Sequence, residues 1–257
     1  MTALITGASV GIGRELARIF AENGHDLVLV ARNLQQLEQV AAECRSLGTI
    51  NARVLQKDLS NPDAAREIFE RLKLDGVVVD VLVNNAGFGN YGRFTDVELD
   101  ADIRLLQVNI VALTALTKLF LPPMLDRGAG RILNVASMAA FQAGPWMSTY
   151  YASKAYVLHF SEAIANECAS RGVTVTALCP GPVKTEFQSR AGIHGSRLFK
   201  GNAAMDARTV AQAGYRGLMR GRRIVVPGLS NAMLVRFSRF VPRRLATFIA
   251  GKMNKVH

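Results

Sequence analysis

The stretch Thr6-Gly7-Ala8-Ser9-Val10-Gly11-Ile12-Gly13 lies between a short apolar run and a segment with helical spacing. Gly7 allows a sharp turn, Gly11 removes a side chain where a phosphate must approach, and Gly13 lets a helix pack close to a sheet. The N-terminus of that helix offers free N–H groups and the positive end of its dipole to an anion. The motif therefore predicts a strand, a turn and a helix that hold a dinucleotide pyrophosphate.

The same alternation of apolar runs and helical stretches continues along the chain. Strands are expected at Ala3–Thr6, Asp26–Ala31, Ala52–Gln56, Val77–Val83, Arg131–Val135, Val173–Leu178 and Arg223–Val226. Helices are expected at Gly13–Asn23, Leu34–Leu47, from Asn61 onward, from Asp100 to about Leu125, and at Tyr150–Arg171. Strands this apolar are buried on both faces. The pattern predicts an α/β fold, a doubly wound parallel sheet (Rossmann fold) of about seven strands with helices on both faces.

A length of 257 residues, about half of them apolar, suits a single domain over residues 1–257. Residues 186–222 have weak periodicity, so we expect a flexible excursion on the substrate side. Neither a basic leader nor an uninterrupted apolar run of membrane-spanning length is apparent. Three dispersed cysteines indicate buried or near-surface thiols in a reducing compartment, and the expected location is cytoplasmic. The cysteines are Cys44, Cys168 and Cys179.

The net charge of +11 comes entirely from the C-terminal fifth of the chain. Residues 207–257 hold 11 basic residues and no acidic one, whereas the rest of the chain has equal numbers of each. No nucleic-acid motif accompanies this charge, so a nucleic-acid partner is not expected. The basic residues are Arg208, Arg216, Arg220, Arg222, Arg223, Arg236, Arg239, Arg243, Arg244, Lys252 and Lys255.

Residues 229–257 are expected to form a basic, amphipathic helical tail. Apolar residues recur at helical spacing between the arginines of Asn231–Ala250, and Pro242 divides the stripe in two. Such a pair of helices could rest on an anionic membrane as a peripheral contact. It could equally cover the mouth of a pocket, contact a subunit, or bind an acidic partner or acyl carrier.

The end of the second predicted strand selects between dinucleotides. Sites that prefer NAD usually carry an acidic residue there to bind the ribose hydroxyls. This chain reads Val30-Ala31-Arg32-Asn33, with no acid. The guanidinium of Arg32 can pair with a 2′-phosphate, so the predicted cofactor is NADP(H).

Further motifs follow the later strands in order. They are Asn84-Asn85-Ala86-Gly87, Asn109, Ser137, Tyr150-Tyr151-Ala152-Ser153-Lys154 and Pro180-Gly181-Pro182-Val183-Lys184-Thr185. Together with the glycine motif they resemble the short-chain dehydrogenase/reductase family, single-domain type, from residue 2 to about 187. The resemblance implies an oxidoreductase acting on carbonyl or alcohol groups, and a dimer or tetramer formed through helices 100–125 and 150–171.

Tyr150 and Lys154 stand four residues apart, on one face of a helix. We expect the nearby ammonium to lower the pKa of the phenol, so that Tyr150 can exchange a proton with a substrate oxygen. The resemblance implies that Ser137 hydrogen-bonds that oxygen, that Lys154 also holds the nicotinamide ribose, and that Asn109 holds a water linking Lys154 to solvent. Ser148 is a rival to Ser137, and Asn109 could instead bridge locally.

The resemblance also implies which residues contact the cofactor, with Asp58 accepting from the adenine amino group and Thr6 bracing the motif. No metal site is expected, since the four histidines do not cluster. The cofactor-binding set is Gly7, Ser9, Gly11, Ile12, Gly13, Arg32, Asn33, Asp58, Leu59, Asn85, Ala86, Gly87, Tyr150, Lys154, Pro180, Gly181, Val183 and Thr185.

The substrate pocket is expected to be apolar, which favours a hydrophobic carbonyl or secondary alcohol over a sugar. Some of the candidate lining residues could instead be core or subunit contacts. The predicted function is hydride transfer between NADP(H) and such a substrate, and the alternative is an NADP(H)-binding sensor or scaffold without turnover. A sugar epimerase would be expected to have a larger C-terminal domain. The candidate lining residues are Phe88, Tyr91, Met138, Phe141, Trp146, Met147, Pro182 and Phe187.

Overall fold

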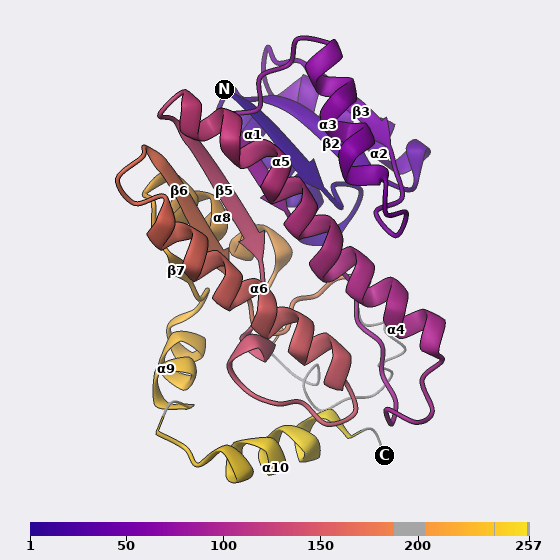
Figure 1. Cartoon of the computed structure of the whole chain (residues 1–257), viewed down its shortest axis with the longest axis vertical. Helices are drawn as coiled ribbons and strands as arrows, with labels where there is room; N and C mark the ends of the chain where they lie inside the picture. The colour runs from indigo at the N-terminus through magenta and orange to yellow at the C-terminus, as the bar shows by residue number, and fades with distance from the viewer. Residues whose placement is uncertain (188–203, 239, 256–257) are drawn as a thin grey trace.

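The fold is built around one parallel sheet, seen in a computed structural model that describes residues 1–187, 204–238 and 240–255 (Figure 1). Seven strands pair in parallel in the order β3-β2-β1-β4-β5-β6-β7, which confirms the doubly wound α/β prediction. The order reverses direction beside β1, and this is where such sheets bind ligands. The strands are β1 Thr2–Thr6, β2 Asp26–Ala31, β3 Ala52–Gln56, β4 Val81–Asn84, β5 Gly130–Val135, β6 Val173–Leu178 and β7 Ile224–Val225.

Helices cover both faces of the sheet because alternate strand residues point to opposite sides. In β1, Ala3 and Ile5 join the core formed with helices α1, α2 and α8, whereas Leu4 joins the core formed with α3, α5 and α6. The bounds of these helices are α1 Gly11–Glu22, α2 Leu34–Leu47, α3 Ala64–Leu74, α5 Leu113–Asp126, α6 Ser148–Glu167 and α8 Ala207–Met219.

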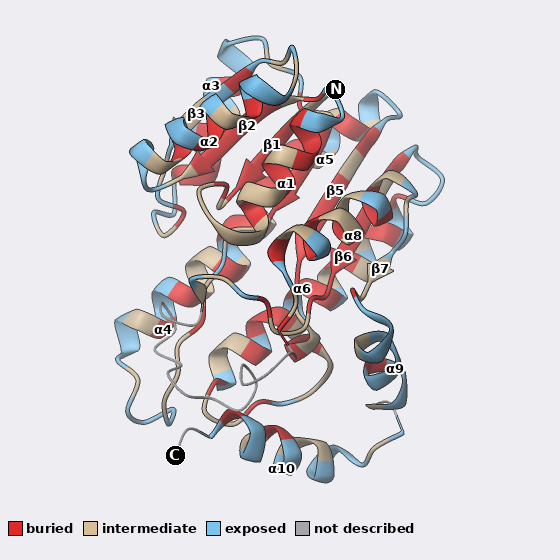
Figure 2. Cartoon of the chain, turned by 180° about the vertical axis from the view of Figure 1, so that it is seen from behind, coloured by how far each residue is buried: buried red, intermediate tan, exposed pale blue. Residues whose placement is uncertain are grey.

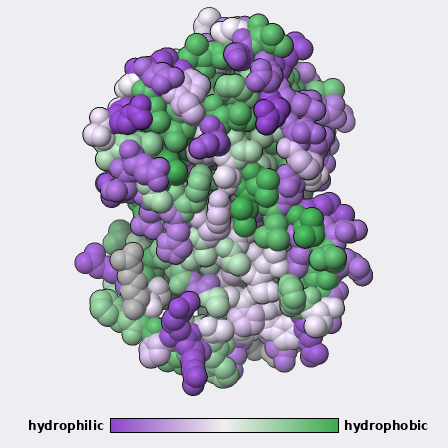
Figure 3. Space-filling view, in the orientation of Figure 1, coloured by the Kyte–Doolittle hydropathy of each residue, from purple (hydrophilic) through white to green (hydrophobic). Residues whose placement is uncertain are grey.

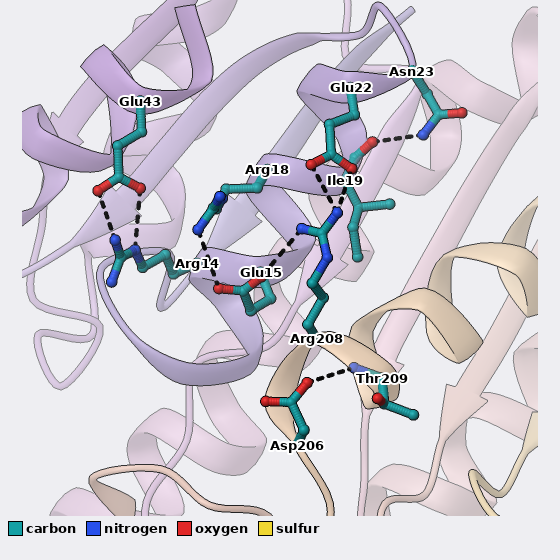
Figure 4. A network of polar contacts seen from close by, with 10 residues as sticks. All are labelled: Arg14, Glu15, Arg18, Ile19, Glu22, Asn23, Glu43, Asp206, Arg208 and Thr209. Atoms are coloured by element: carbon teal, nitrogen blue, oxygen red, sulfur yellow. Dashed lines mark hydrogen bonds and ion pairs between the residues drawn. The ribbon is translucent and has the colours of Figure 1, made fainter. Parts of the chain in front are cut away.

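Helix α8 corrects one sequence expectation, since residues 207–219 lie within the stretch predicted to be a flexible excursion. This helix packs against α1, and Arg208 bridges them by ion pairs to Glu22 at 2.9 Å and Glu15 at 3.5 Å (Figure 4). Exposed pairs of this kind add about 0–1 kcal/mol each, so apolar burial accounts for most of the packing. Residues 188–203 of the predicted excursion lie outside the described residues.

The long helix expected from Asp100 to about Leu125 is present but not uniform. It runs as α4 Leu99–Leu106, a π-helical segment Gln107–Ala112, and α5. This helix is long and apolar enough in composition to cross a membrane, yet 44% of its most apolar window is buried within the protein. It packs on α3 and the sheet, as a core helix does.

The C-terminal tail forms two helices, α9 Leu229–Ser238 and α10 Arg243–Asn254. They lie beyond the end of the sheet and are largely exposed (Figures 1 and 2). The helical part of the tail prediction is therefore confirmed. The three cysteines are all buried and unpaired, as expected of core thiols.

Candidate active site

A cavity of about 1290 Å³ opens at the carboxyl ends of the strands, beside the reversal of strand order. It is lined at one end by the β1–α1 turn and the ends of β2 and β3, and at the other by α6, the loop after β6, and the tail helices. Pockets for a single small ligand are usually about 300–1,000 Å³. This volume therefore suits a dinucleotide together with a second, smaller ligand.

The glycine motif shapes one wall of the cavity so that a pyrophosphate fits. Gly7 and Gly11 have φ values of +64° and +57°, which favour glycine, and both line the cavity. Helix α1 begins at Gly11 with no side-chain cap and no acid in its first turn. The first backbone N–H groups of α1 therefore remain available to an anion.

Thr6 and Asn85 brace this wall from behind. The Thr6 hydroxyl donates to the Val83 carbonyl at 3.2 Å and accepts from the N–H groups of Asn85 and Ala86 at 3.0 and 3.1 Å. The Asn85 amide donates to the carbonyls of Thr6 and Gly7. Thr6 is buried and does not line the cavity, so its predicted bracing role is confirmed.

The far end of the cavity is polar and holds two cationic side chains. Arg32 lines it from the end of β2, is exposed, and no acidic side chain stands in its place. Lys57 lines the same end and forms an ion pair with Glu67 at 2.6 Å. The side chain of Asn33 caps α2 by accepting from the Gln36 N–H, and the Asp58 carboxylate accepts from Ser60. This end can therefore present cations to a ribose phosphate.

Tyr150 lies on α6 within the cavity, and Ser137 faces it from the end of β5. Burial raises the pKa of the Tyr150 phenol to about 12, while a hydrogen bond with the Ser137 side chain acts to lower it. The sequence argument expected a lowered pKa, so the direction is opposite, because desolvation outweighs every favourable contact. The rival serine, Ser148, is exposed and does not line the cavity.

Lys154 is buried near Tyr150, with its Nζ atom 5.8 Å from the Tyr150 ring centroid. The Nζ atom donates to the Val135 carbonyl at 2.8 Å. Burial lowers the pKa of this ammonium to about 8, although the Cys179 thiol opposes the shift. The two side chains thus face one cavity, with a neutral phenol and an amine that titrates near neutral pH.

The lowered pKa of Lys154 predicts a dependence of stability on pH. The pKa of Lys154 is 10.5 in the unfolded chain and about 8 in the folded one, so between these pH values the unfolded chain binds more protons. The free energy of unfolding is therefore highest above pH 10.5 and decreases as the pH falls to 8. The expected loss is about 3 kcal/mol. Urea unfolding between pH 8 and 10 should show that Lys154→Met lacks this slope. Equal slopes in the variant and the parent chain would contradict the assignment.

Asn109 lies in the π-helical segment, a deviation often found at functional sites. Its side chain does not line the cavity but links the loop at Phe88 to α6. The Oδ1 atom accepts from the Phe88 N–H, and Nδ2 donates to the Phe88 carbonyl and to Ser153 Oγ. A Cβ on Gly87 would stand 3.0 Å from Asn109 Oδ1 and 3.2 Å from Lys154 Nζ. The local bridging alternative is therefore observed, and the water link to Lys154 stays a prediction.

The end of the cavity where a substrate is expected, here called the substrate end, is lined mostly by apolar side chains. Phe187 packs on the Tyr150 ring, with centroids 5.3 Å apart. Two of the eight predicted lining residues lie elsewhere: Tyr91 and Trp146 stack on each other outside the cavity, so they are packing contacts. The predicted residues that do line it are Phe88, Met138, Phe141, Met147, Pro182 and Phe187.

The tail completes this end of the cavity. Asn254, almost fully buried, accepts from the Tyr151 hydroxyl at 3.0 Å and donates to the Pro145 carbonyl at 2.9 Å. These bonds fix α10 beside α6, the helix that carries Tyr150. The sequence pattern did not identify the tail residues that line the cavity, because nothing in their spacing marks which face turns inward. They are Asn231, Leu234, Val235, Ser238, Ile249 and Met253.

Most predicted site residues converge on this one cavity, while Gly13 and Asn109 lie behind its wall. Gly13 is buried and serves close packing of α1 on the β1 turn. Lys57, Gln36 and Arg104 also line the cavity and were not predicted. The predicted residues that line it are Gly7, Ser9, Gly11, Ile12, Arg32, Asn33, Asp58, Leu59, Asn85, Ala86, Gly87, Ser137, Tyr150, Lys154, Pro180, Gly181, Val183 and Thr185.

A family model described as "short chain dehydrogenase" matches residues 1–194. The chain belongs to the short-chain dehydrogenase family. Members of this family bind nicotinamide cofactors and act on carbonyl or alcohol substrates.

Individual relatives agree with this membership. The "Probable oxidoreductase EphD" of Mycobacterium tuberculosis is 36% identical over 191 residues, covering 74% of this chain and 32% of EphD. The chain thus spans about a third of that relative's length. A short-chain dehydrogenase from Sphingobium yanoikuyae, solved in complex with NADPH, is 35% identical with a TM-score of 0.84, covering 93% and 91% of the two chains. A "bulky-bulky ketone specific alcohol dehydrogenase" from Comamonas testosteroni is 31% identical with a TM-score of 0.80, covering 93% and 90%.

Proposed function

We propose that this short-chain dehydrogenase uses NADP(H) to interconvert a hydrophobic carbonyl compound and its secondary alcohol, with Tyr150 as the general acid and base. The observation that carries the proposal is the placement of Tyr150, Ser137 and Lys154 at the junction between a phosphate-binding wall and an apolar chamber. When bound, the nicotinamide supplies or accepts the hydride.

The residues of the chain handle the proton. Tyr150, with a pKa of about 12, keeps its proton at neutral pH and can donate it from the hydroxyl to a carbonyl oxygen. Ser137 is placed to hydrogen-bond the same oxygen and orient it. Lys154, beside Tyr150, can charge or discharge near neutral pH and so favour return of the proton. This arrangement suits reduction, and it supports turnover over the alternative of a sensor without chemistry.

The proposed preference for NADP(H) rests on Arg32 and the absence of an acid beside it. A charge-assisted hydrogen bond contributes about 1.5–3 kcal/mol, so Arg32→Ala is expected to weaken NADPH binding by about 10- to 100-fold. NADH binding should change little, because it has no 2′-phosphate. Fluorescence titration of both dinucleotides checks this. Tighter binding of NADH than NADPH to the parent chain would contradict the proposed preference.

The substrate class is tested by following NADPH oxidation with bulky aromatic, steroid-like and acyl-chain ketones, and with sugars as the polar comparison. The apolar lining of the substrate end predicts turnover of bulky ketones and little with sugars. The similarity to the ketone-specific dehydrogenase from Comamonas testosteroni supports the same class. Faster turnover of sugars would overturn it.

Assembly into a dimer or tetramer through α4–α6 stays a prediction. Three apolar side chains exposed on this face, Ile103, Val111 and Tyr156, support it.

A further inference from the structure

The tail helices expose apolar side chains that a protein core would normally bury. On α9, Leu229, Met233 and Phe237 recur every fourth residue, so they share one face, and each is more than half exposed. On α10, Leu245 and Phe248 are 49% and 59% exposed on the side away from the buried Ala250 and Asn254. In Figure 2 both helices are mostly coloured as exposed. Large apolar surfaces of this kind usually mark a binding site.

Cations surround this apolar face. Arg236, Arg243 and Arg244 are exposed, and none of them forms an ion pair with a carboxylate in the part of the chain that the structure describes. Lys252 lies over the Phe248 ring, with its Nζ atom 4.6 Å from the centroid. Figure 3 shows hydrophobic and hydrophilic side chains next to one another at the lower end of the molecule, where α9 and α10 lie.

The arginines at the start of α10 point to an anionic partner. Arg243 and Arg244 occupy the first turn of α10, where the helix dipole already places positive charge, and no acidic residue offsets them there. Basic residues are unfavourable at this end of a helix. A layer of anions against the first turn would relieve that repulsion.

The same surface borders the mouth of the cavity. Leu234 of α9 and Ile249 of α10 line the cavity and are also 60% and 45% exposed. Both tail helices therefore contribute apolar side chains to the cavity wall as well as to the exposed surface, although Asn231 and Ser238 of α9 also line the cavity.

We propose that α9 and α10 form a membrane-docking surface that rests on an anionic lipid bilayer and turns the substrate end of the cavity toward it. The apolar side chains enter the interface between headgroups and acyl chains, while the arginines and Lys252 contact the phosphates. An isologous contact with a second copy is disfavoured, because it would bring two wholly basic segments together. The docking does not depend on turnover, so it stands or falls separately from the proposed function.

Co-sedimentation with vesicles tests the surface, using the full chain and phosphatidylcholine vesicles with and without phosphatidylglycerol. We expect binding only to the anionic vesicles, with release as the salt concentration rises. Arg243→Glu with Arg244→Glu should reduce partitioning by at least about tenfold, since each basic residue contributes to surface attraction. Met233→Ser with Phe237→Ser should reduce it by a similar factor through lost apolar insertion.

The matched control is Arg66→Glu with Leu74→Ser, an exposed basic and an exposed apolar residue on α3, at the opposite end of the molecule. This variant should bind anionic vesicles as the parent chain does. NADPH titration of every variant reports that the fold is intact. Equal sedimentation with neutral vesicles, no sedimentation of the parent chain with anionic vesicles, or unchanged binding of both tail variants would each overturn the proposal.

Discussion

Replacing Tyr150 with Phe is expected to lower kcat by about 10²–10⁴-fold while NADPH still binds, since this is the usual contribution of a positioned general acid. The substitution removes one oxygen and keeps the ring, so the contact with Phe187 survives. The Tyr150 hydroxyl is the proposed proton donor, because burial raises its pKa to about 12 and so keeps it protonated at neutral pH. The measurement is steady-state turnover with a ketone from the substrate screen, beside a fluorescence titration of NADPH.

The control for this substitution is Tyr156→Phe on the same helix. The Tyr156 hydroxyl pairs with Thr114 at the surface, 2.9 Å away, and does not line the cavity. Its loss should leave turnover within about twofold, as surface changes have small effects. A Tyr150→Phe variant that keeps most of its turnover would show that another group supplies the proton.

The sequence predicted which residues meet in the cavity because parallel strands bring their carboxyl ends to one edge of the sheet. Gly7, Asn85, Ser137 and Pro180 are far apart in the chain, but each follows a strand of this sheet, so the order of motifs was enough to bring them together. The parallel pairing of the sheet needs only apolar runs, which are visible in the sequence.

Features that depend on tertiary contacts were harder to predict. The predicted direction of the Tyr150 pKa shift was wrong, since helical spacing shows that Lys154 is near but not how strongly the phenol is desolvated. Helix α8 was missed because five of its 13 residues are alanine or glycine, whose small side chains mark an apolar face poorly, although the helix buries Val210 and Leu218 against the sheet and α1. The inward face of the tail depends on the bonds of Asn254 to Tyr151 and Pro145, which no local pattern reveals.

Gly13 was expected both to let the helix pack close to the sheet and to belong to the cofactor-binding set; it does not line the cavity, and the structure supports the packing role. A Cβ at this position would stand 2.1 Å from the Gly7 carbonyl oxygen and 2.4 Å from the Asn85 amide nitrogen. The first of these atoms belongs to the backbone of the turn, so it cannot rotate away as a flexible side chain would. The Asn85 amide also holds the carbonyls of Thr6 and Gly7, and moving it would loosen the phosphate-binding wall.

We therefore expect Gly13→Ala to lower the free energy of unfolding by about 3 kcal/mol, the upper part of the usual range for overpacking, and to weaken NADPH binding as well. Urea unfolding and dinucleotide titration measure the two effects. Gly251→Ala is the matched control, because this helical glycine has only the Pro145 ring nearby, at 3.3 Å, and alanine favours helix. Of these two glycines, only Gly13 would bring the new methyl group against the backbone. An equal, small effect of both substitutions would therefore mean that the β1–α1 turn can shift to accept a methyl group, and that close packing of α1 does not require glycine.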